Sequence, residues 1–96
     1  ARQVEAAGKI FTPHTWGTGI GVMGNLHVTA GTVDTPFIEF PFDPPEWTNE
    51  RRDYMMKETI EADGEGWIHL SDRPGLGFEL NEDVLRATAS SQATFS

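Results

Sequence analysis

KIFTP (Lys9–Pro13) and TPFIEF (Thr35–Phe40) decide the fold of this 96-residue chain. Both are short runs rich in apolar or β-branched residues, which is typical of strands. The second is nearly continuous, as in a parallel strand covered on both faces. Between them we predict a helix over residues 18–30, which Gly31 ends. Strand, helix and strand within about 30 residues make one βαβ unit. The sequence therefore predicts an α/β fold.

Glycines mark one side of the predicted helix. Each glycine in a helix interior costs about 1 kcal/mol relative to alanine, so a stripe of them predicts that the backbone closely approaches another surface. Apolar residues on the other sides indicate a helix buried on most of its faces. The stripe consists of Gly17, Gly21, Gly24, Val28 and Gly31, and the apolar residues are Ile20, Met23, Leu26 and Ala30.

The same glycines allow a second interpretation. GIGVMG (Gly19–Gly24) matches the dinucleotide-binding fingerprint, and Glu39 stands 20 residues beyond Gly19, where such folds carry the ribose-binding acid. That fingerprint needs its first glycine directly after a strand, so that pyrophosphate meets the start of the helix. Here residues 13–18 intervene, and the motif falls inside the helix. Close helix packing is the favoured explanation.

The flanking segments complete the predicted organisation. Residues 2–8 are expected to be the end of a helix stopped by Gly8, and the proline-rich residues 41–48 a rigid loop. We divide the chain into residues 1–48 and residues 49–96. The second part is predicted to hold a short helix over 49–56, a β-hairpin of 57–60 and 67–70, and a helix from Glu82 to about Ala89 capped by Asn81.

Charge and composition exclude several classes of function. Seven basic and 15 acidic residues give a formal net charge of −8, which disfavours nucleic acid as a partner. Without cysteine, the chain has no disulfide, thiolate nucleophile or sulfur-based zinc site. No apolar run approaches the roughly 20 residues of a membrane-spanning helix, and the first residues do not resemble a signal peptide. We expect a soluble, cytoplasmic protein with no membrane partner. The start within a helix suggests a piece of something longer, with an isolated N-terminal helix as the equal alternative.

His14 and Glu39 are the residues that could carry chemistry. Each lies at the end of a predicted parallel strand, and adjacent strands are about 5 Å apart, so both side chains can face one pocket. A histidine at this position is a candidate proton carrier. The alternative is a loop histidine that is only hydrogen-bonded to the backbone. A carboxyl among Phe37, Ile38 and Phe40 must be paired, bound to a ligand or protonated. A purely structural ion pair is the alternative for Glu39.

The other polar candidates indicate structure rather than chemistry. His27 and His69 are expected to be packed or surface residues, and they share no ligand spacing with His14, so no metal site is predicted in the chain. Arg51 and Arg52 form a basic pair in an acidic chain and are expected to be salt-bridged.

Three segments together resemble the enolase superfamily: FTPHTW (Phe11–Trp16), the acid after Phe37-Ile38, and DRPGLGFEL (Asp72–Leu80). Within that superfamily the chain is most similar to the mandelate racemase subgroup and its acid-sugar dehydratases. The resemblance implies the C-terminal part of a modified TIM barrel with an α+β capping domain. The two predicted strands would be strands seven and eight of the barrel, and the hairpin and tail would return to the capping domain.

The resemblance also implies a reaction. His14 would be the general base that takes the proton α to a carboxylate, and Glu39 would hydrogen-bond that carboxylate as it becomes an enediolate. Trp16 would wall the pocket of a small carboxylate substrate. The Mg²⁺ ligands, and an aspartate that orients His14, would lie upstream of Ala1, so this chain alone would be inactive.

The implied activity belongs to a complete homo-oligomeric enzyme that includes the rest of the barrel and the capping domain. Dehydration of a sugar acid is the leading expectation, and racemisation or epimerisation is the closest alternative because it shares the first proton abstraction. A small binding module that folds on its own is the alternative from another class.

Overall fold

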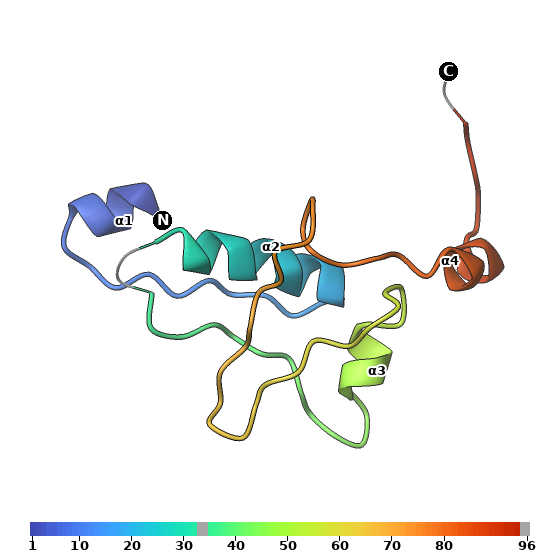
Figure 1. Ribbon diagram of the computed structural model, residues 1–96, viewed down its shortest axis with the longest axis horizontal. Coiled ribbons are helices and arrows are strands. Elements are labelled where there is room, and N and C mark those ends of the chain that lie inside the picture. Colours follow the sequence, from blue (N-terminus) through green and yellow to red (C-terminus); the bar gives the residue numbers. More distant parts are fainter. Residues whose placement is uncertain (33–34, 95–96) are drawn as a thin grey trace.

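The computed structural model describes residues 1–32 and 35–94. Its helices are α1 (Arg2–Ala6), α2 (Gly19–Ala30), α3 (Asn49–Arg52) and α4 (Glu82–Thr88), joined by long irregular segments (Figure 1). Two isolated antiparallel bridges, Asp43 with Trp47 and Met56 with Leu80, add local order. In these two ranges no helix has the length and apolarity needed to cross a bilayer.

The two predicted strands are not formed as strands in the described part of the chain, which corrects the expectation for residues 9–13 and 36–40. Figure 1 still shows both segments running in one direction, while α2, which stands between them in the sequence, runs the opposite way, so the path of a βαβ unit is kept. A strand is defined by a ladder of hydrogen bonds to a neighbour. The described residues provide neither segment with such a neighbour, and both stay extended but unpaired.

The predicted hairpin of residues 57–60 and 67–70 is corrected for the same reason. Its turn exists, because Asp63 N–H donates to the Trp67 carbonyl at 2.8 Å and Gly66 takes a φ of +88° that favours glycine. No strand ladder extends from this turn within the described residues.

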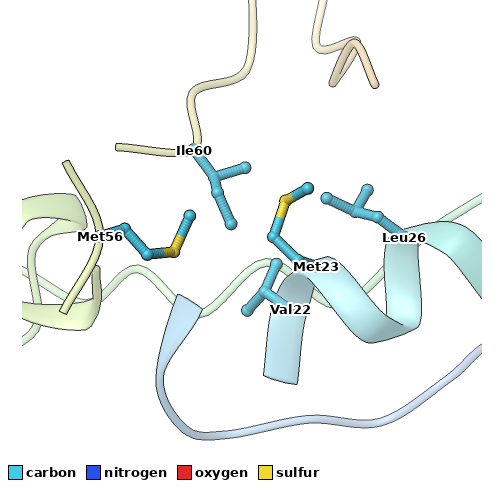
Figure 2. Close-up of a cluster of buried hydrophobic side chains, with 5 residues drawn as sticks. All are labelled: Val22, Met23, Leu26, Met56 and Ile60. Atoms are coloured by element: carbon cyan, nitrogen blue, oxygen red, sulfur yellow. The ribbon is translucent and has the colours of Figure 1, made fainter. Parts of the chain in front are cut away.

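One face of α2 provides most of the apolar core. Val22, Met23 and Leu26 are buried against Met56 and Ile60, which come from the segment after α3 (Figure 2). The spacing of the three α2 residues places them on a single side of the helix. Burial on most sides of α2, as predicted, is wrong for the described chain, since Val28 and Ala30 are exposed. Partly buried apolar residues from both halves of the chain surround this core: Ile38, Phe40, Ile68, Leu70 and Phe78.

The close approach of α2 to another surface occurs at Gly19 and not along the predicted stripe. A Cβ added to Gly19 would overlap the Asp53 carboxylate and lie 2.7 Å from Met56 Sδ. A Cβ at Gly17 or Gly24 would meet nothing within 4 Å among the described residues. The glycines of the fingerprint lie within α2, as the favoured interpretation requires.

The helix ends follow the sequence closely. Gly8 stops α1 with a φ of +64°, and the Asn81 side chain accepts from the N–H of Val84 to cap α4. The predicted helix over 49–56 ends early, at Arg52. The last two residues of the predicted C-terminal tail lie outside the described residues.

The chain is too open for an autonomous domain of its size. Its radius of gyration is 15.4 Å, against about 12.5 Å for a compact chain of this length. Its accessible surface is 7080 Å², against about 5,500 Å² for a folded monomer of this mass. Large apolar side chains, including Ile10, Phe37 and Trp67, are mostly exposed. These values oppose the alternative of a self-contained binding module.

We expect the isolated 96-residue chain to unfold without a cooperative transition, because its core is small and its extended segments have no neighbours. Urea titration followed by tryptophan fluorescence and near-ultraviolet circular dichroism would test this. A single sharp transition seen by both probes would contradict the expectation and restore the autonomous module.

Gly19→Ala in the complete protein should lower the free energy of unfolding by about 1–3 kcal/mol, because Asp53 cannot move away from the added methyl. Gly24→Ala is the matched control. It adds a methyl to open space on the same helix and should be neutral or stabilising by up to about 1 kcal/mol. Denaturant midpoints measure both changes. An equal loss at Gly24 would support the predicted glycine stripe against the packing described above.

Candidate functional site

The structure brings His14 and Glu39 together. His14 Nδ1 lies 2.6 Å from Glu39 Oε2. The same carboxylate oxygen accepts a hydrogen bond of 2.5 Å from the backbone N–H of Thr15. His14 ends the first extended segment and Glu39 lies near the end of the second, so the contact joins the two halves of the βαβ path. The predicted juxtaposition of these side chains is therefore present.

The pair borders an open, shallow pocket of about 280 Å³, lined by Thr12, Pro13, His14, Ile38 and Glu39. The His14 side chain is 81% exposed and that of Glu39 34% exposed. Phe37, expected to help bury the Glu39 carboxyl, is itself 74% exposed. Glu39 was expected to be paired, bound to a ligand or protonated. In the structure it is paired with His14.

The contact with Glu39 determines which ring nitrogen of His14 is free to accept a proton. A neutral imidazole that donates its Nδ1 proton to Glu39 presents Nε2 as an acceptor. A proton taken up at Nε2 gives an imidazolium whose charge faces the Glu39 carboxylate at 2.6 Å. The pair can thus accept a proton and give it back at one atom, which is what a general acid or base does.

Trp16 takes part in an aromatic stack that sequence reasoning missed. Its ring lies 6.5 Å from that of Trp47, centroid to centroid, with 23° between the planes, and the Arg51 guanidinium lies 5.9 Å from the Trp47 ring. The proline-rich loop returns Trp47 to this place through a pair of backbone hydrogen bonds with Asp43. Trp16 is not among the residues that line the His14–Glu39 pocket, and its role as a pocket wall stays a prediction.

Arg52 and Asp53 form a fully buried ion pair next to the core. Arg52 Nε and Nη2 donate to the two Asp53 carboxylate oxygens, each at 2.7 Å. Arg52 also donates to the carbonyl oxygens of Pro41 and Ile60, and Asp53 accepts from the Ile60 N–H at 2.7 Å. The expectation that the basic pair is salt-bridged is confirmed for Arg52, whereas Arg51 donates to the Glu46 carbonyl.

The remaining histidines have local partners. His27 Nε2 lies 3.1 Å from the Leu76 carbonyl, and His69 Nε2 lies 2.7 Å from Asp63 Oδ2. Within residues 1–32 and 35–94, no three acidic or histidine side chains are grouped to hold a metal ion. The described residues do not form a magnesium ligand set.

Comparison with known proteins identifies the family. Residues 1–84 match the family described as Enolase C-terminal domain-like. The chain belongs to this family. The predicted membership of the enolase superfamily, as a C-terminal portion, is confirmed. No solved structure gives a significant match.

Two curated relatives of this enolase-family chain carry enzyme names. It is 40% identical over 77 residues to the arabinonate dehydratase of Saccharolobus solfataricus, a match that covers 80% of the chain and 19% of the relative. It is 33% identical over 82 residues to the D-galactarolactone cycloisomerase of Agrobacterium fabrum, covering 81% of the chain and 21% of the relative. The chain thus spans about one fifth of the length of these relatives.

A second histidine–carboxylate pair, Asp63 with His69, differs from the first by stabilising a turn. The hydrogen bond from His69 and those from the N–H groups of Trp67 and Glu65 lower the pKa of Asp63 below its usual value. Because the folded pKa is the lower one, the stabilisation is complete above the unfolded pKa and is lost as the pH falls through the folded value.

Acidification below about pH 4 should therefore reduce the protection of the Glu65 and Trp67 amides, measured as hydrogen-exchange protection factors in the complete protein. Asp63→Asn keeps an oxygen acceptor that does not titrate, and in this variant the protection should no longer follow the pH. The same acid response in both proteins would show that Asp63 is not its source.

Proposed function

We propose that the chain is the carboxy-terminal part of an enolase-superfamily enzyme that removes the proton α to the carboxylate of a sugar acid and eliminates its β-hydroxyl as water. The contact between His14 and Glu39 is the observation that carries this proposal, because it places a proton carrier and its partner at an open pocket. The extended segments 9–13 and 36–40 would be the last two barrel strands, and they would gain their ladders from neighbours outside this chain.

In the proposed reaction, His14 takes the α-proton at Nε2 while the proton on its Nδ1 stays there, hydrogen-bonded to the Glu39 carboxylate. The electron pair of the broken C–H bond passes into an enediolate. His14 then gives the proton to the departing β-hydroxyl, which leaves as water, and the resulting enol becomes a 2-keto-3-deoxy acid. Substrate and products balance as one acid converted to one keto acid and one water.

The geometry gives Glu39 a role in addition to the one implied by the resemblance. The contacts described above involve Oε2, which faces His14 Nδ1 and the Thr15 N–H. In our proposal Oε2 orients His14 and stabilises its imidazolium, and Oε1 is left for the substrate. Magnesium in the complete enzyme would need ligands from outside the described residues.

An isomerase or epimerase is the second candidate, favoured by the relative named as a cycloisomerase. Both activities begin with removal of an α-proton, so the His14–Glu39 pair serves either. They differ in whether the intermediate loses a hydroxyl or is reprotonated.

His14→Asn in the complete protein should abolish exchange of the substrate α-proton with deuterated solvent, a loss of about 10²-fold or more, because the base is removed. Proton nuclear magnetic resonance of a panel of sugar acids in D₂O measures this exchange. His69→Asn is the matched control, since it removes another exposed histidine paired with a carboxylate and should leave exchange unchanged.

The products separate the two candidate functions. Release of a 2-keto-3-deoxy acid supports dehydration, whereas scrambling of the α-configuration alone supports isomerisation. Exchange that persists in the His14→Asn enzyme would remove His14 from its proposed role.

A further inference from the structure

Arg52 holds the backbone that immediately follows Glu39. Its guanidinium carbon lies 4.2 Å from the centroid of the Phe40 ring, and Nη1 donates to the Pro41 carbonyl oxygen at 3.2 Å. Phe40 and Pro41 are the next two residues after Glu39. These contacts therefore hold the two residues directly after Glu39 in place.

Asp53 holds the segment that follows His14. Its carboxylate packs against Gly19 so closely that a Cβ there would overlap it. The carboxylate cannot withdraw, because Arg52 and the Ile60 N–H both bind it at 2.7 Å. Gly19 is the first residue of α2 and stands five residues after His14. The tight contact between Gly19 and Asp53 therefore holds the start of α2 in place against the ion pair.

We propose that the buried Arg52–Asp53 pair is a positioning element that sets the His14–Glu39 contact, an inference that rests on the proposed function. Arg52 fixes the segment of Glu39, Asp53 fixes the segment of His14, and two hydrogen bonds of 2.7 Å join these side chains to each other. Both side chains are fully buried, so water does not compete for these bonds. Neither residue lines the pocket, so the pair acts through His14 and Glu39 and not on the substrate.

Arg52→Lys in the complete protein is the test. Lysine keeps the charge but has no planar fork to bind Asp53 at two points while lying over Phe40. We expect kcat for α-proton exchange to fall about 10- to 100-fold with KM changed less than about twofold, because a small displacement of catalytic groups is costly. Arg51→Lys is the matched control, since the Arg51 side chain is exposed and donates to the Glu46 carbonyl instead of to Asp53.

A spectroscopic readout separates positioning from general stability. The His14 Nδ1 proton, assigned by its loss in His14→Asn, should give a downfield resonance through its short contact with Glu39. That resonance should shift upfield or disappear in Arg52→Lys and stay in place in Arg51→Lys. An unchanged kcat, or a reduced kcat with the resonance unmoved, would overturn the proposal.

Asp53→Asn is the second variant, read in the same two ways, in case Arg52→Lys does not fold. If neither variant folds, the pair serves stability alone and the positioning proposal is wrong. Failure of the proposed function is distinguished by His14→Asn. Exchange that survives there refutes the role of His14, whereas exchange lost there but unaffected by Arg52→Lys refutes only the positioning role.

Discussion

The buried guanidinium of Arg52 joins the second extended segment to the residues on either side of α3. It binds the carbonyl oxygens of Pro41 and Ile60 and the carboxylate of Asp53, and it covers the ring of Phe40. A charge is costly to bury unless its partners are all in place, and breaking such a pair costs about 3–5 kcal/mol. Met56 and Ile60, which belong to the same stretch, also complete the apolar core against α2. Ion pair and core therefore stabilise one arrangement of the second extended segment, α2 and α3.

Local sequence signals predicted local structure well. Gly8 and Asn81 mark helix ends because a positive φ and a side-chain cap depend on neighbouring residues only. The helix over residues 18–30 was nearly correct for the same reason. Strands differ, because residues 9–13 and 36–40 have the composition of strands but their ladders depend on partners that no local pattern contains. The prediction from the stripe of glycines was wrong for a similar reason: a Cβ at Gly17 or Gly24 would meet nothing within 4 Å among the described residues, while the close contact falls on Gly19.

The part of the candidate site that depends on the direction of the two extended segments was predictable from the sequence. The ends of two neighbouring segments that run in one direction lie together, and this pattern alone predicts that His14 lies beside Glu39. The apolar neighbours of Glu39 suggested burial, but the exposed side chain of Phe37 does not provide it. Trp47 was missed because its place beside Trp16 depends on how the proline-rich loop turns back. For the buried Arg52–Asp53 pair, the sequence indicated that Arg52 would form a salt bridge. It did not indicate the partner or that the pair would be buried.

The contact between the Thr15 backbone and Glu39 spans 24 positions of the chain. Under the function proposed above, one short stretch of sequence encodes both His14 and Glu39. Changes elsewhere in a complete enzyme could then alter which acid is chosen, or the fate of the intermediate, without disturbing this pair. Relatives named for a dehydratase and for a cycloisomerase each match about four fifths of this chain, so chains similar to it occur in enzymes with different names.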